Sequence, residues 1–120
     1  MAVLKSYREL DVWKKSIDWI EAIYRASSGF SPDERFGLTS QIRRAAVSIA
    51  ANIAEGAERT STGEYLQFLS VASGSVAEVE TLLLVAQRLD MLAPTDTERL
   101  LQQGAEIGRM LNGLKRSLRR

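Results

Sequence analysis

The sequence predicts an all-α protein folded as an antiparallel, up-down-up-down four-helix bundle. Apolar residues recur at spacings of three and four along four long segments, which is the pattern of amphipathic helices. Proline occurs only at Pro32 and Pro94, each just after residues typical of a turn. Because the three connections are short, consecutive helices should be antiparallel neighbours. The length suits one domain, so residues 1–120 are taken as a single four-helix-bundle domain.

The first helix is predicted over residues 6–27, with Ser28 and Gly29 ending it. One heptad-like row of apolar residues should face the core. This row consists of Leu10, Trp13, Ile17, Ile20 and Tyr24. Trp19 lies off the row, which leaves it as an interface residue or as a platform on which a nucleic-acid base could stack.

The second helix is predicted over residues 31–55 and begins with a capping box. Ser31 would be the N-cap, Pro32 the first helical residue and Glu34 the acid that completes the box. Gly56 suits the C-terminal cap of this helix.

Polar residues form a narrow seam along this second helix, in place of the broad charged face of an ordinary surface helix. The seam consists of Gln41, Arg44, Ser48, Asn52 and Glu55, while Val47, Ala50, Ala51 and Ala54 fill most of the remaining surface. A helix with so few hydrophilic residues should be covered on more than one side. Because buried polar groups need hydrogen-bond partners, the seam points to an assembly before it points to a catalyst.

The third helix is predicted over residues 61–89 from a second capping box, formed by Ser61 and Glu64. Its core face consists of Tyr65, Leu69, Ala72, Val76, Val79 and Leu83, and a second apolar face consists of Val71, Leu82, Val85 and Leu89. Glu78 lies within the second face, an unusual place for a carboxylate. Gly74 is expected to allow close packing of another helix.

The fourth helix follows Pro94, with Thr95 as the predicted N-cap and Glu98 at the third position. Its apolar residues are Leu100, Leu101, Ile107, Leu111, Leu114 and Leu118. Three glycines weaken its intrinsic helicity, so packing against the other helices must stabilise it.

Composition argues against most enzyme classes. The chain has no histidine and no cysteine, which removes the commonest general base, the thiolate nucleophile and the usual transition-metal ligands. No enzymatic activity, metal, cofactor or small-molecule substrate is therefore expected. No apolar run approaches the roughly 20 residues that span a bilayer, and the N-terminus lacks the apolar block of a signal peptide. We accordingly expect no membrane association and a cytoplasmic location.

The net charge of +1 is unevenly distributed. Residues 109–120 hold five basic residues and no acid, so the remaining 108 residues carry 11 basic and 15 acidic side chains. A basic tail is typical of nucleic-acid contact, and it also opposes the dipole at a helix C-terminus. The basic residues taken as nucleic-acid-binding candidates are Lys5, Arg8, Lys115, Arg116, Arg119 and Arg120.

Two motifs resemble a known family. One runs from Phe36-Gly37-Leu38 through residues 41–49 to residues 52–56, and the other comprises Phe68-Leu69, Ala72, Gly74-Ser75 and residues 78–80. Together they resemble the four-helix-bundle proteins encoded in intervening sequences of bacterial 23S ribosomal RNA genes. The resemblance implies a ring-like homopentamer with a poorly defined biochemical role. A related accessory protein of diversity-generating retroelements has a similar fold, but it is basic and binds nucleic acid, whereas the body of this chain is not basic.

The polar seam, extended by Ser75 and Glu78, has two interpretations. It is either a hydrogen-bonded layer that fixes helix register or subunit contacts, or a site for a polar ligand or an RNA phosphate. Small serine and alanine side chains favour the structural interpretation. We further expect Arg43 or Arg44 to neutralise Glu78 or Glu80, within one chain or between chains, because an unpaired charge among apolar residues is costly.

Two functional hypotheses remain. The first is a non-enzymatic homo-oligomeric scaffold, pentameric by resemblance, that binds RNA, a ribonucleoprotein or a nucleic-acid-processing protein through basic surface patches multiplied by symmetry. The alternative is a protein-binding adaptor with no nucleic-acid contact, which the near-neutral net charge favours.

Overall fold

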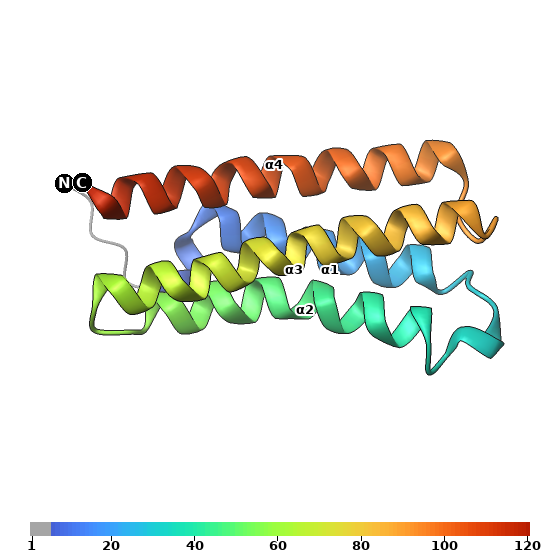
Figure 1. Cartoon of the computed structure of the whole chain (residues 1–120), viewed down its shortest axis with the longest axis horizontal. Coiled ribbons are helices and arrows are strands. Elements are labelled where there is room, and N and C mark those ends of the chain that lie inside the picture. Colours follow the sequence, from blue (N-terminus) through green and yellow to red (C-terminus); the bar gives the residue numbers. More distant parts are fainter. Residues whose placement is uncertain (1–5) are drawn as a thin grey trace.

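The computed structural model describes residues 6–120, and its regular structure consists of helices alone over that range (Figure 1). The elements are η1 (Tyr7–Glu9), α1 (Asp11–Ser27), η2 (Pro32–Glu34), α2 (Leu38–Ala57), α3 (Thr62–Arg88) and α4 (Pro94–Arg119). The four α-helices form an elongated bundle with extents of 47 × 25 × 20 Å. The predicted all-α fold and four-helix bundle are confirmed.

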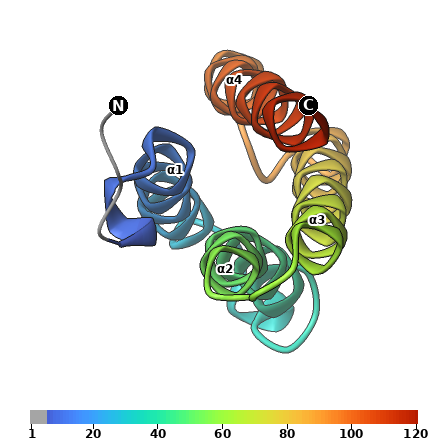
Figure 2. The same ribbon diagram turned by 90° about the vertical axis from the view of Figure 1, so that its left-hand side faces the viewer.

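The helices follow one another around the bundle in chain order. Viewed end-on, α2 lies between α1 and α3, and α4 lies between α3 and α1 (Figure 2). The most extensive packing joins α2 to α3, and the least extensive joins α1 to α4. The polar seam predicted from the sequence lies on this α2/α3 side of the bundle.

The predicted core row of α1 is confirmed only in part, because α1 is rotated. Leu10, Trp13 and Ile20 are partly buried and pack against the core, whereas Ile17 and Tyr24 are exposed. The fully buried residues of α1 are Val12, Ser16, Trp19, Ile23 and Ser27. Trp19, which was expected at an interface or on a nucleic acid, is completely buried.

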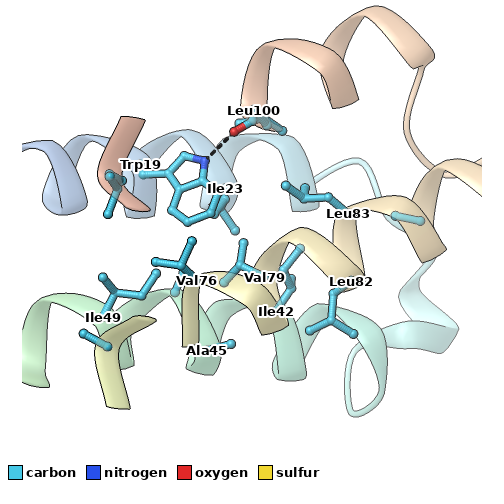
Figure 3. Packing of buried hydrophobic residues seen from close by; sticks show 14 of the residues in the cluster. Trp19, Ile23, Ile42, Ala45, Ile49, Val76, Val79, Leu82, Leu83 and Leu100 are labelled. Atoms are coloured by element: carbon cyan, nitrogen blue, oxygen red, sulfur yellow. Dashed lines mark hydrogen bonds between the residues drawn. The ribbon is translucent and has the colours of Figure 1, made fainter. Parts of the chain in front are cut away.

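A single hydrogen bond explains this rotation. The indole N–H of Trp19 donates to the backbone oxygen of Leu100 in α4 at 3.0 Å, so the ring must face the bundle interior (Figure 3). Gly104 lies against the ring, since a Cβ there would be 2.7 Å from a Trp19 ring carbon. The buried serines of α1 satisfy their hydroxyls on backbone oxygens of the same helix, which explains how two polar residues can lie on the core side.

The single helix predicted over residues 31–55 is broken. Residues 32–34 form one 3-10 turn, and α2 starts only after Gly37, whose backbone has φ −104° and ψ −113°. The Ser31 hydroxyl accepts from the Asp33 N–H at 3.3 Å, while Glu34 Oε1 accepts from the Leu38 N–H at 3.1 Å. Glu34 thus caps the N-terminus of α2 instead of completing a box with Ser31.

Several other helix ends differ from prediction. The first helix was expected from residue 6, but a 3-10 turn precedes α1, with Leu10 extended between them. Gly56 lies inside α2 and not at its cap; a Cβ there would be 2.9 Å from Phe68 Cβ, so this glycine permits close α2–α3 packing. Ala93, not Thr95, is the N-cap of α4.

The capping box of α3 is confirmed. The Glu64 N–H donates to Ser61 Oγ at 3.1 Å, and Ser61 Oγ lies 3.0 Å from Glu64 Oε1. The predicted core residues of α3 and α4 that are buried are Leu69, Ala72, Val76, Val79, Leu83, Leu100, Ile107 and Leu111, while Tyr65, Leu101, Leu114 and Leu118 are partly buried. Gly74 does not serve packing within the chain, because a Cβ there would meet no atom within 4 Å.

Replacing Gly104 by alanine should destabilise the protein. The new methyl group would lie 2.7–2.8 Å from two Trp19 ring carbons. Such overpacking costs about 1–3 kcal/mol and outweighs the gain of roughly 1 kcal/mol in helix propensity. Urea unfolding of Gly104→Ala at fixed protein concentration should show a lower free energy of unfolding. Gly108→Ala, in the same helix, is the matched control. A Cβ at Gly108 would meet no atom within 4 Å, so this variant should be as stable as the wild type or more stable. An equal change in the free energy of unfolding for the two variants would contradict the packing argument.

Glu80 should make stability depend on pH. Its side chain is partly buried and lies near the position that a Gly104 Cβ would occupy, and among residues 6–120 it has no ion-pair partner. Burial raises the pKa of Glu80 above its ordinary value of 4.5. The fold therefore tolerates the protonated form better, and this contribution to stability is lost as the pH rises through the folded-state pKa. Glu80→Gln should raise the free energy of unfolding at pH 7. This gain should become smaller below about pH 4.5, where the wild-type carboxyl group is protonated. Glu98→Gln, at an exposed position, is the control. If Glu80→Gln gave the same gain in the free energy of unfolding at pH 7 and below pH 4.5, burial of the charged Glu80 would not be the cause.

Candidate functional site

The polar seam lies along the boundary between α2 and α3. Its centre is a small hydrogen-bonded group: the hydroxyls of Ser48 and Ser75 are 2.9 Å apart, and the Asn52 side-chain amide donates to Ser48 O at 2.8 Å and to Ser48 Oγ at 3.0 Å. Ser75 is buried, and the other two are partly buried. This group joins the two helices, so it can fix their register.

The rest of the seam is not buried within one chain. Gln41, Arg44, Glu55 and Glu78 are all exposed in the single chain. Whether the same residues lie at a contact between chains stays a prediction.

A polar surface hollow adjoins the seam at the α2 N-terminus. It has a volume of about 570 Å³ and is lined by Phe36, Gly37, Ser40, Gln41, Arg44, Ala45, Ser48 and Glu78. Although Arg44 and Glu78 both line it, they form no ion pair, and neither has an opposite charge within 4.0 Å among residues 6–120. The expected neutralisation of Glu78 or Glu80 by Arg43 or Arg44 is therefore not formed within one chain.

Arg43 has a different partner from the one expected. Its guanidinium donates to Ser27 Oγ at 2.8 Å and to Tyr24 O at 3.1 Å, and it lies 4.6 Å from the centroid of the Tyr24 ring. These contacts satisfy backbone and side-chain oxygens at the C-terminus of α1. Arg43 therefore joins α1 to α2 and does not project freely toward a ligand.

The basic candidates differ in their surroundings. Lys5 lies outside the described residues, and Arg8 belongs to η1, which packs against α1 and α2, with its guanidinium over the Tyr7 ring. Lys115 faces α3 and donates to Ser73 Oγ at 2.7 Å. Burial, together with the positive charge of Arg119, lowers the pKa of Lys115 below its ordinary value of 10.5. Lys115 thus acts in helix packing, a role that the sequence pattern did not reveal.

The arginines of the α4 C-terminus are free. Arg109, Arg116, Arg119 and Arg120 are exposed, and none forms an ion pair within the described part of the chain. Three of them were predicted candidates, and Arg109 extends the set along the same helix. Unpaired guanidinium groups in water are available to phosphate oxygens.

Two exposed apolar surfaces accompany these polar features. The first, the α1/α2 strip, comprises Ile17, Tyr24, Val47 and Ala51, of which the three large side chains are 40%, 41% and 43% exposed. Val47 lies one helical turn beyond Arg43, whose guanidinium contacts Tyr24, so the strip follows the boundary between the two helices.

The second surface, the α3 row, comprises Val71, Val85 and Leu89, with Glu78 midway along it. The three apolar side chains are 49%, 39% and 58% exposed, and the spacing of seven between residues 71, 78 and 85 places them on one side of α3. Among residues 6–120, α3 is also the one helix long and apolar enough to cross a membrane by length and composition, with a mean hydropathy of 1.5 over 18 residues. The expectation that no segment reaches this threshold is therefore wrong. The core helix of a bundle passes the same test, and a third of this window is buried in the bundle.

Clusters of potential metal ligands were one further possibility for a site. Over residues 6–120, no three carboxylates come together as a potential metal site. Trp13 and Tyr24, which were expected in the core row of the first helix, contact Tyr7 and Arg43 respectively. The arrangement is suited to contacts between surfaces and to binding of anions by arginine.

Comparison with known proteins identifies a family and a solved structure of similar fold. The family described as 23S rRNA-intervening sequence protein matches residues 8–113 of the chain. The fold is similar to the crystal structure of a protein with unknown function from the S23 ribosomal protein family of Bacteroides thetaiotaomicron. That similarity has a TM-score of 0.78 and 24% sequence identity, over 87% of this chain and 97% of that chain. No curated protein matches the sequence.

The serine pair at the centre of the seam should behave as a coupled unit. Ser48→Ala would leave the buried Ser75 hydroxyl without its partner, at a cost of about 1–2 kcal/mol in the free energy of unfolding. Ser75→Ala should cost a similar amount. The double variant should lose clearly less than the sum, because no orphaned hydroxyl remains on α3. Urea unfolding of all four proteins at one concentration measures the coupling, and strictly additive losses would show that the two hydroxyls act independently.

Proposed function

Since the chain belongs to the family of 23S rRNA-intervening sequence proteins, we propose that it is a non-enzymatic, homo-oligomeric helical scaffold, a pentamer, that binds RNA or a ribonucleoprotein through exposed arginines. It would act in the cytoplasm, without a cofactor. The observation that carries the proposal is the pair of exposed apolar surfaces on one small bundle. Each surface places several half-exposed large apolar side chains along one side of a helix or helix pair, and apolar side chains grouped on a surface favour an interaction site.

The α4 arginines support the choice of RNA as the client. Four exposed guanidinium groups lie within the last 12 residues of the chain, and none has a protein partner among residues 6–120. One chain has a net charge of only +1, so its affinity for a polyanion would be modest. A symmetric assembly presents the same arginine cluster several times, and contacts made together strengthen binding without any new interaction.

The alternative is an adaptor that binds another protein and no nucleic acid. It is favoured by the acidic balance of residues 1–108, where 15 acidic side chains face 11 basic ones. The two functions differ in how binding responds to salt. Phosphate contacts release counterions and weaken steeply as salt is added, whereas apolar docking does not.

The experiment combines light scattering on size-exclusion eluate with RNA titration. The wild-type chain should elute at about five times its 13.3 kDa mass. Its elution should shift to a larger mass when a labelled single-stranded RNA of mixed sequence is added. The logarithm of the RNA-binding constant should fall linearly with the logarithm of the salt concentration. The variant Arg116→Gln/Arg119→Gln/Arg120→Gln should keep the mass but bind RNA more weakly. Its salt slope should fall by about 0.7 for each RNA phosphate that the variant no longer neutralises.

The control for this variant removes one positive charge at a position remote from the α4 C-terminus. Arg88 is exposed at the end of α3 that lies away from the C-terminus of α4, and Arg88→Gln should leave RNA binding unchanged (Figure 1). A monomeric wild type would contradict the scaffold. An oligomer that RNA does not shift would contradict RNA binding and support the adaptor.

A further inference from the structure

The geometry points to a binding site for a small zwitterion in the polar surface hollow at the α2 N-terminus. The ligand carries one ammonium and one carboxylate group, which is the chemistry of a free amino acid or a dipeptide. Arg44 binds the carboxylate, and Glu78 binds the ammonium. This inference goes beyond the proposed function and depends on neither RNA binding nor assembly.

The serine pair sets the positions of these two charged side chains. Ser48 in α2 and Ser75 in α3 have their hydroxyls 2.9 Å apart, and the two helices run antiparallel side by side (Figure 1). Arg44 lies one turn before Ser48, and Glu78 lies one turn after Ser75. Because the helices are antiparallel, both steps lead in the same direction along the bundle. Arg44 and Glu78 therefore lie at the same level on opposite helices.

The hollow beside these side chains has room for a ligand. Its volume of about 570 Å³ falls within the roughly 300–1,000 Å³ typical of small-molecule sites. Ala45 and Ser48 contribute short side chains to its lining. Gln41 is exposed one turn before Ala45, and its side-chain amide can donate to a carboxylate oxygen.

The charges of the hollow favour a zwitterion over a simple ion. Arg44 and Glu78 are both exposed, and neither forms an ion pair within the described range of the chain. A lone anion would be attracted by Arg44 and repelled by Glu78, and a lone cation would meet the reverse. A zwitterion gives each side chain an oppositely charged partner and adds no net charge.

A second carboxylate makes a phosphate group a poor alternative. Glu34 Oε1 accepts from the Leu38 N–H at 3.1 Å, close to Gly37, which lines the hollow. A phosphate beside Arg44 would therefore meet two carboxylates and one guanidinium group. The N–H group at the start of α2 that would attract an anion is already occupied by this carboxylate.

Three probes of similar size separate the two charges of the ligand. Glycylglycine carries both, N-acetylglycine lacks the ammonium, and glycylglycinamide lacks the carboxylate. Saturation-transfer NMR on the full chain detects weak binding to a monomer or to a larger assembly. At about pH 6.5 the α-amino groups, with an ordinary pKa of about 7.7–8.0, are protonated. Glycylglycine should bind, and loss of either charge should weaken binding about tenfold, because one charge-assisted hydrogen bond is lost.

Two variants assign each charge of the ligand to its side chain. Arg44→Gln should abolish the preference for glycylglycine over glycylglycinamide and keep the preference over N-acetylglycine. Glu78→Gln should do the reverse. Both positions are exposed, so both variants should fold. The matched controls are Arg109→Gln and Glu98→Gln, at exposed positions of α4, which does not line the hollow, and they should keep the wild-type affinities.

Each of three results would overturn the inference. Equal binding of the three probes would show that the two charges do not recognise the ligand. Tighter binding of inorganic phosphate than of glycylglycine would make the hollow an anion site. Absence of saturation transfer to every probe at about 50 mM would mean that the hollow holds no such ligand. The mass of the assembly and its shift with RNA are measured separately, so failure here is distinct from failure of the proposed function.

Discussion

The burial of Trp19 is the constraint on which the surface of this protein depends. Its indole N–H must reach the backbone oxygen of Leu100, and its ring must lie against Gly104, so α1 can adopt only one rotation about its axis. That rotation turns Ile17 and Tyr24 outward beside α2. One hydrogen bond in the core thus decides which apolar residues remain available to a partner.

The contact between α2 and α3 has a comparable effect on the other side of the bundle. Gly56 lets the helices approach closely at one end, and the serine pair joins them near the middle. With small residues at the contact, the larger aliphatic side chains of α3 divide between the core and the outer row of Val71, Val85 and Leu89. Burial of a lone carboxylate among them would be unfavourable, and Glu78 is exposed in the single chain.

The sequence predicted the helices better than their faces. Apolar spacing located all four helices, and the Ser61–Glu64 box located the start of α3, because these signals are local. The orientation of α1 could not be predicted, since two rows compete and the buried one contains two serines whose hydroxyls are satisfied by the helix backbone. The break before α2 could not be predicted either. The Glu34 side chain accepts from the Leu38 N–H instead of completing a capping box with Ser31, and residue spacing does not distinguish these two possibilities. Within the seam, Ser48 and Ser75 do form a hydrogen bond between α2 and α3. The roles of Arg43 and Lys115 depend on oxygens of other helices, to which a single sequence gives no access.

The proposed homo-oligomer would also give a use to the uneven charge of the chain. The two exposed apolar surfaces belong to α1, α2 and α3, so contacts made through them would leave the outer side of α4 in solvent. The exposed arginines of α4 would then be repeated once in every copy. A polyanion would meet a cationic cluster on each copy, whereas a single chain offers one cluster and a net charge of only +1. On the proposed function, affinity for RNA would therefore come from the number of copies, and RNA binding and assembly would be coupled equilibria.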